Sequence, residues 1–251
     1  ATLAFGLCSA AIGADGGGSI RIPASFCGVF GLKPTYSRVS EHGAFPLCWS
    51  VAHIGPIATN TFDLSLLYGI IAGPDTHDRN SLSQPKVILP DNDFTLLGKT
   101  IGIFRPWFEH ANSEIVRSCE NVLNNCKKLG AHITEIEIPE LNAMRQAHSI
   151  IIVSEMANAV NKHKLGLEQF GFPTRINLEI GNYFTAADYV HALRMRTRAY
   201  QIFHDIFSKV DVIITPSTAI TAPSFPKKYE SCGYSDLSTV IEIMRYAFPA
   251  N

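Results

Sequence analysis

The feature that most constrains this chain is a glycine-rich stretch near its beginning, residues 13–23, which reads Gly-Ala-Asp-Gly-Gly-Gly-Ser-Ile-Arg-Ile-Pro. Glycine is favoured where the backbone adopts a positive φ or approaches another group closely, but it carries an entropic cost, so three in succession need a reason. A tight turn is one reason. The other is that the amides of residues 16–19 point into one cavity, where they hold an anion beside the nucleophilic hydroxyl of Ser19.

Composition limits what this loop belongs to. The 251 residues are 46% hydrophobic and 17% charged, which is typical of a globular chain. A net charge of −1 and the lack of basic runs give no electrostatic reason to expect a nucleic-acid partner. No apolar run reaches the roughly 18 to 20 residues that a membrane span needs. We therefore expect neither a nucleic-acid partner nor a transmembrane segment.

The cysteines and histidines show no metal-ligand spacing. The six cysteines are scattered without a Cys-x-x-Cys pair, and the nine histidines lack a His-Glu-x-x-His pattern. We expect no metal and no cofactor, and the histidines are expected at the surface or in the core. The absence of an Asn-x-Ser/Thr acceptor and of a secretory signal favours an intracellular location. Both ends of the chain are apolar and the first residue is not Met, which we interpret as a piece of a longer protein.

The hydrophobic pattern predicts an α/β chain, a mixed β-sheet core flanked by helices and incomplete at both ends. We assign residues 1–251 to a single domain. Residues 1–75 carry the glycine loop, residues 99–138 form a strand, helix and strand, and residues 139–251 add a helical layer and one core strand.

In the first part, residues 1–11 are apolar and fit the end of a buried helix that leads into a short strand before Gly13. Residues 36–56 contain glycine and proline and predict a loop. Thr61 is predicted to cap a helix with Asp63 in its first turn. Because this helix is apolar on all sides, we expect it to be buried.

The second and third parts have clearer periodicity. Ser113 is predicted to cap a helix whose apolar residues recur at steps of four and three until Gly130. Strands expected at 99–105 and 133–138 complete a βαβ unit with a right-handed crossover. A long helix is predicted to begin at Thr185.

A further strand, expected at 210–215, stops at a proline. Loops at the carboxyl ends of such strands usually hold ligands in α/β proteins. Thr215, Pro216 and Thr218 are therefore candidates for a pocket wall.

Three common uses of a glycine loop do not fit the residues around Ser19. A phosphate-binding P-loop requires Gly-Lys-Ser/Thr, and Gly18 precedes the serine here. The glycine spacing does not give the dinucleotide fingerprint Gly-x-Gly-x-x-Gly. The α/β-hydrolase elbow Gly-x-Ser-x-Gly requires glycine where Arg21 stands. A serine beside a cluster of donors remains, and a lysine of lowered pKa is a base that can activate it.

These residues resemble those of a known family. Residues 13–23 closely match the second half of the amidase signature, and residues 31–40, Gly-Leu-Lys-Pro-Thr-Tyr-Ser-Arg-Val-Ser, resemble the segment that follows it. Residues 54–58, 72–75 and 211–216 also fit in order. Within the family the chain is most similar to plant-type fatty acid amide hydrolases, on the basis of Pro139-Glu140-Leu141, Met144-Arg145, Ala147-His148 and Ala187-Asp188-Tyr189.

The resemblance implies an amidase-signature fold and a Ser, cis-Ser, Lys mechanism. It places the nucleophile on Ser19 and the oxyanion hole on the backbone of Gly16, Gly17, Gly18 and Ser19. It makes Asp15 and Arg21 the residues that hold the loop through hydrogen bonds.

The family's lysine and bridging serine lie upstream of the matched segment, so we expect them before residue 1. Lys33 belongs to the downstream segment and is expected to be structural, and Ser9 is in the wrong context for the bridging role. On this interpretation residues 1–251 alone are inactive.

The resemblance implies an amide substrate, with a fatty acid amide or N-acylethanolamine preferred, and is compatible with peripheral contact to an internal membrane and with a homodimer. Two alternatives stay open. One is a truncated, catalytically inactive member that acts as a binding or structural module. The other is the amidase subunit of a complex that makes Gln-tRNA.

Overall fold

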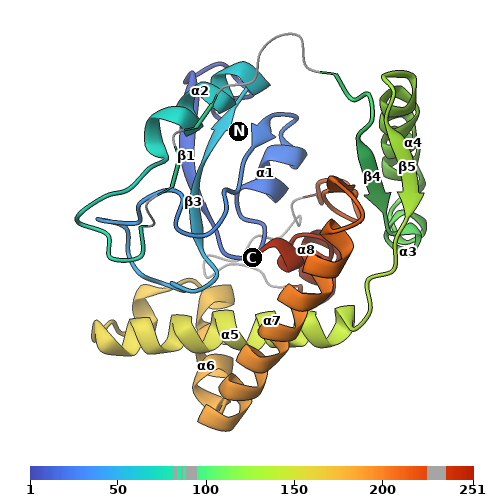
Figure 1. Ribbon diagram of the computed structural model, residues 1–251. Helices are drawn as coiled ribbons and strands as arrows, with labels where there is room; N and C mark the ends of the chain where they lie inside the picture. Colours follow the sequence, from blue (N-terminus) through green and yellow to red (C-terminus); the bar gives the residue numbers. More distant parts are fainter. Residues whose placement is uncertain (82–83, 86, 89–94, 225–235) are drawn as a thin grey trace.

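The computed structural model describes residues 1–81, 84–85, 87–88, 95–224 and 236–251. It has two three-stranded sheets on opposite sides of the molecule, and long helices run below both of them (Figure 1). The predicted α/β class is confirmed, with the strands divided between two sheets among the described residues.

The first sheet is antiparallel and leads directly to the glycine loop. Strand β1, Ala10–Asp15, pairs with β3, His53–Ala58, which in turn pairs with β2, Phe30–Gly31. The short helix α1, Arg21–Phe26, begins two residues after Ser19. The loop is thus held between a strand and a helix, and the strand expected before Gly13 is present.

Two expectations for the region around this sheet are wrong. Residues 1–7 form turns rather than a helix, and Phe5 is 80% exposed. The last four residues of the predicted loop 36–56 belong to β3, because His53 and the three residues after it pair with β1. Pro56, part of the predicted loop, lies within this strand. It has no N–H to donate, but its carbonyl accepts a hydrogen bond from Leu32 N (3.0 Å).

Helix α2, Thr61–Ile71, differs from its prediction in its cap and in its burial. Asn60 is the cap, because its side chain accepts a hydrogen bond from Asp63 N at 2.8 Å. The helix packs on β3, but none of its residues is buried, and Phe62 is 68% exposed. An apolar helix is buried only where neighbours cover every side, and within the described chain α2 is covered on one side.

The second sheet is parallel, in the order β5-β4-β6. Its strands are β4, Thr100–Ile103, β5, His132–Glu135, and β6, Val212–Ile214. Helices α3, Arg105–His110, and α4, Ser113–Lys128, connect β4 to β5, so the predicted βαβ unit is confirmed. Helix α3 was not predicted, and Asn112 occupies the cap position expected for Ser113.

Long helices form the base of the molecule (Figure 1). They are α5, Leu141–Lys162, α6, Phe172–Tyr183, and α7, Ala186–Phe207. Thr185 caps α7 through a capping box with Asp188, as its position predicts. Helix α5 packs against α6, α7 and the 3-10 helix Phe248–Ala250, while the short helix α8, Leu237–Met244, precedes this last element.

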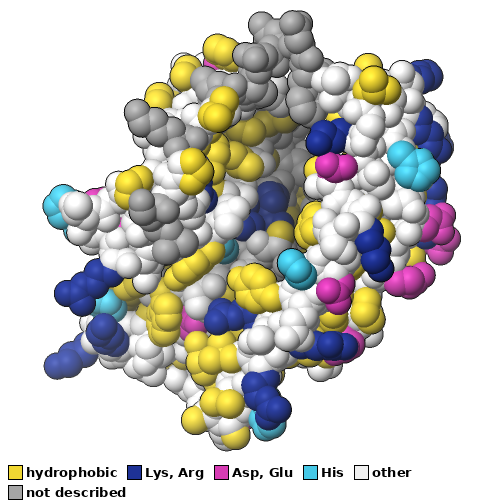
Figure 2. All heavy atoms as spheres, viewed as in Figure 1, with side chains coloured by type: hydrophobic (Ala, Val, Ile, Leu, Met, Phe, Trp, Pro, Cys, Tyr) yellow, Lys and Arg dark blue, Asp and Glu magenta, His cyan; other side chains and the backbone are white. Residues whose placement is uncertain are grey.

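The C-terminal segment joins the two halves of the structure. The hydroxyl of Tyr246 donates to the carbonyl of Trp107 in α3 at 2.8 Å, and Phe248 belongs to the same buried cluster as Met144 of α5. Figure 2 shows a hollow between the half that carries β1 and the half that carries β4, with basic side chains visible inside it. Within the described ranges, no helix is long and apolar enough to cross a membrane.

Candidate active site

The glycine loop is organised around the carboxylate of Asp15, the last residue of β1. This side chain is fully buried. It accepts hydrogen bonds from the backbone amides of Gly18 at 2.6 Å, Ile20 at 3.2 Å and Arg21 at 3.3 Å. One carboxylate therefore fixes the course of the backbone around Ser19 and the first residue of α1.

Arg21 compensates the charge of Asp15. Its Nε lies 3.0 Å from Asp15 Oδ2 and its Nη2 lies 3.0 Å from Asp15 Oδ1, while Nη1 donates to the carbonyl of Ala247 at 2.9 Å. Burial alone would raise the pKa of the Asp15 carboxyl, but the hydrogen bonds and charge of Arg21, with bonds from Asn251 and Gly18, hold that pKa well below its usual range. Asp15 is therefore ionised at neutral pH.

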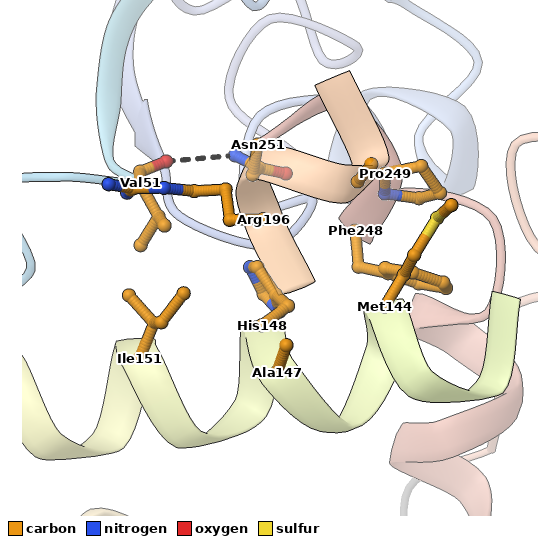
Figure 3. Close-up of a pocket in the computed structure, with 10 residues that line it drawn as sticks. Val51, Met144, Ala147, His148, Ile151, Arg196, Phe248, Pro249 and Asn251 are labelled. Carbon is orange, nitrogen blue, oxygen red and sulfur yellow. Dashed lines mark hydrogen bonds between the residues drawn. The ribbon is translucent and has the colours of Figure 1, made fainter. Parts of the chain in front are cut away.

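Asn251 completes this network, and no pattern in the sequence points to it. Its Nδ2 lies 2.9 Å from Asp15 O, 3.0 Å from Asp15 Oδ1 and 3.1 Å from Val51 O, and its Oδ1 accepts from Arg21 Nη2 at 2.5 Å. Figure 3 shows the bond to Val51. Because Asn251 is far from the loop in sequence and stands in no motif, only the tertiary structure reveals its contact with Asp15.

Close packing disfavours a side chain at two of the glycines: the end of the Met244 side chain would have to move away from Gly17, and the fixed Cβ of Ala247 crowds Gly18. A Cβ at Gly17 would lie 2.6 Å from Met244 Cε, and a Cβ at Gly18 would lie 2.3 Å from Ile22 Cδ1 and 2.8 Å from Ala247 Cβ. Gly18 also has a φ of +121°, which L side chains rarely adopt.

Ser19 is exposed, and its hydroxyl makes no hydrogen bond within the described residues. The amides of Gly16, Gly17 and Ser19 likewise have no acceptor among them, whereas the amide of Gly18 is occupied by Asp15. In this conformation Gly18 supports the loop with its N–H instead of offering it to a ligand, which differs from the set of four donors expected from the sequence.

Lys33 lies near the buried pair without bonding to it. Its Nζ donates to the carbonyl of Pro34 at 2.7 Å. Burial, together with the positive charge of Arg21, lowers the pKa of Lys33 to about 8. The expectation that Lys33 is structural remains a prediction.

His148 is a second residue at the site to which the sequence assigned no role. It rises from α5 toward Asn251 (Figure 3), and its Nε2 lies 2.8 Å from the carbonyl oxygen of Gly16. The ring lines a small cavity of about 50 Å³ with Met144, Arg196 and Phe248. A histidine inside a helix carries no local signal that it contacts a loop 132 residues earlier.

A larger cavity, of about 310 Å³, adjoins the other side of the loop and is lined by Arg21, Phe30, Thr215 and Pro216, among others. Thr218 does not line it. That residue is buried, and its hydroxyl donates to the carbonyl of Ile220 at 2.8 Å. Two of the three candidates for a pocket wall therefore line a cavity beside the loop.

Among the residues that the structure describes, no group of three or more His, Cys, Asp or Glu side chains is placed to hold a metal ion. The five described cysteines are free thiols, and Cys232 lies outside the described residues.

The chain is similar to known proteins over its whole length. The family model described as Amidase matches residues 1–251. The chain is 41% identical to a fatty acid amide hydrolase of Medicago truncatula over 100% of its own length and 43% of that protein. It is 35% identical to a glutamyl-tRNA(Gln) amidotransferase subunit of Prochlorococcus marinus, over 96% of the chain and 56% of the relative.

Solved structures show the same fold. The crystal structure of a glutamyl-tRNA(Gln) amidotransferase subunit from Thermotoga maritima superposes with a TM-score of 0.82 at 26% identity, covering 100% of this chain and 54% of the other. The chain thus spans about half the length of the relatives it matches. Because the family model covers every residue and the fold agrees, the chain belongs to the amidase signature family.

Proposed function

We propose that the protein containing this chain is a serine amidase that hydrolyses a carboxylic amide through an acyl-enzyme on Ser19. The observation that carries this proposal is an exposed serine beside the amides of Gly17 and Ser19, which have no acceptor among the described residues, on a loop held by Asp15. A fixed pair of donors next to a nucleophile is the arrangement that acyl transfer requires.

In the proposed reaction Ser19 Oγ attacks the amide carbonyl carbon. The carbonyl oxygen becomes the oxyanion, which the amides of Gly17 and Ser19 stabilise. Collapse breaks the C–N bond and releases ammonia or an amine, which takes up the proton removed from Ser19. Water then hydrolyses the ester and frees the acid. We assign the proton transfer to the family's lysine and bridging serine, which the resemblance does not place on any residue of 1–251.

We propose a fatty acid amide or N-acylethanolamine as the substrate. The support is the identity of 41% with a protein described as a fatty acid amide hydrolase, which exceeds the 35% identity with the amidotransferase relative. Family membership by itself implies only an amide.

The test uses the full-length protein and a serine-directed fluorophosphonate. Wild type and the control Ser9→Ala should be labelled, because Ser9 is exposed and precedes β1, at the opposite end of that strand from Asp15. Ser19→Ala should not. Equal labelling of all three proteins would remove Ser19 as the nucleophile. Long-chain acyl amides should react faster than short ones, and equal rates would remove the lipid part of the proposal.

A further inference from the structure

One amide of the loop is already bonded and is not available to an oxyanion. Gly18 N–H is bound to Asp15 Oδ1 at 2.6 Å, so among the amides of residues 16–19 those of Gly16, Gly17 and Ser19 are left without an acceptor in the described part of the chain. Donors stabilise an oxyanion only when they are aimed at it before the reaction. The orientation of the Gly17 amide therefore matters, and it is set by the peptide that joins Gly16 to Gly17.

One contact fixes that peptide from outside the loop. His148 Nε2 lies 2.8 Å from Gly16 O. In a trans peptide the C=O and the N–H point to opposite sides, and the described chain has no cis peptide bond. Holding Gly16 O toward α5 therefore turns the N–H of Gly17 away from α5.

Packing around the imidazole of His148 holds the ring in place against Gly16 O. His148 is 8% exposed, and the centroid of its ring lies 6.2 Å from that of Phe248. It also abuts the next glycine, because a Cβ at Gly17 would lie 3.1 Å from its Cε1. The ring is thus packed against Phe248 on the C-terminal 3-10 helix and against the loop itself.

The proton on His148 can be assigned from its partners. A carbonyl oxygen only accepts, so the bond to Gly16 requires a proton on Nε2. Burial lowers the pKa of His148, and the bond to Gly16 opposes this effect. The charged groups on the packed elements are Arg21 and Asp15 on the loop side, whose effects on this pKa are opposed, and Arg196 of α7 in the same cavity. The ring is neutral at pH 7, with its single proton on Nε2.

We infer that His148 is a positioning residue, which donates from Nε2 to Gly16 O and so aims the Gly17 N–H at the oxyanion. It touches neither substrate nor the reacting atoms, and it exchanges no proton in the reaction. The inference rests on the proposed function of Ser19. It would make α5 part of the catalytic apparatus, although α5 carries no motif for it.

Kinetics of the full-length protein test the role. His148→Leu removes the donor and should lower kcat about 10- to 100-fold with KM within about threefold, because removing one oxyanion donor typically costs 10²- to 10³-fold and here the donor is misdirected rather than lost. His148→Gln keeps an amide N–H near the same position and should restore most of kcat. Ser149→Ala, on the exposed side of α5, is the matched control and should equal wild type. Equal kcat values for wild type and His148→Leu would overturn the inference, and so would a His148→Gln variant that folds and is as slow as His148→Leu.

A second measurement does not depend on activity. Nitrogen-15 NMR of histidine-labelled wild type at pH 7 should show His148 as the neutral Nε2–H tautomer, with its signal assigned by loss in His148→Gln. An Nδ1–H tautomer or a charged ring would refute the hydrogen bond to Gly16. A wild type that neither hydrolyses amides nor labels with fluorophosphonate would instead defeat the proposed function, while the tautomer still decides whether the bond to Gly16 exists.

Discussion

Replacing Asp15 with asparagine should destabilise the protein strongly although the shape of the side chain is kept. Asp15 Oδ1 accepts from Gly18 N, Arg21 Nη2 and Asn251 Nδ2, while Oδ2 accepts from Ile20 N and from Arg21 N and Nε. Whichever oxygen becomes an NH₂ group, three N–H donors then face a donor in a fully buried position.

The magnitude follows from the burial of the ion pair. Breaking a buried pair by removing one charge costs about 3 to 5 kcal/mol, and a hydrogen bond to a charged group contributes about 1.5 to 3 kcal/mol. These figures overlap and cannot be added. The side chain of Arg21 is 23% exposed, so water partly solvates the guanidinium that is left behind. We therefore expect a loss of about 3 kcal/mol.

Urea unfolding of the full-length protein at pH 7 measures this loss as a lower midpoint with an unchanged slope. Asp211→Asn is the matched control, because Asp211 also pairs with a cation, Lys99 at 3.1 Å, and accepts from a backbone amide, Thr100 N at 2.8 Å, but its side chain is 40% exposed. A much smaller loss is expected there. The reasoning is refuted if Asp15→Asn costs less than about 1 kcal/mol or no more than the control.

Three further predictions concern residues around the loop. Gly18→Ala should cost several kcal/mol more in unfolding free energy than Gly28→Ala, since both glycines have a positive φ but only a Cβ added at Gly18 would lie within 3 Å of other atoms. Equal losses in a thermal-unfolding comparison would contradict the packing argument. Asn251→Ala should lower the unfolding free energy by about 1 to 2 kcal/mol and slow fluorophosphonate labelling, and labelling at the wild-type rate would show that the loop holds without it. Burial and the charge of Lys33 lower the pKa of His53 to about 4, so the folded protein loses stability as the pH falls from about 6.5 toward 4, where the unfolded chain binds a proton that buried His53 does not. The urea midpoint of His53→Gln should fall less across that window than the midpoint of wild type. Equal falls in the two proteins would argue against a neutral buried imidazole.

The elements that the sequence predicted well are those with strong local signals. Helix α4 has apolar residues at helical spacing and a glycine at its end, Gly130, with a φ of +93°. Helix α7 begins at the capping box of Thr185. The βαβ unit follows from such signals because each strand and helix is specified by its own residues.

The errors occur where distant partners decide. The start of β3 looks like part of a loop and becomes a strand because β1 pairs with it, while β2 pairs only with its last two residues, Ile57 and Ala58. Helix α2 has the composition of a buried helix, yet none of its residues is buried, since composition does not say which neighbours are present. Asn60 rather than Thr61 caps it, a difference of one residue that cap geometry alone resolves.

The candidate site likewise combines features that neighbouring residues specify with contacts that distant residues supply. The sequence by itself pointed to the loop and its serine, because three successive glycines permit backbone conformations that other residues avoid, and the family resemblance implied that Asp15 and Arg21, six residues apart, support this loop. Only the tertiary structure decided that Asn251 closes the network from 236 residues away, that His148 holds the carbonyl of Gly16, and that Gly18 uses its amide on Asp15. The physical reason is that hydrogen-bond partners of a buried loop are chosen by which surfaces pack together, and that choice is spread over the whole chain.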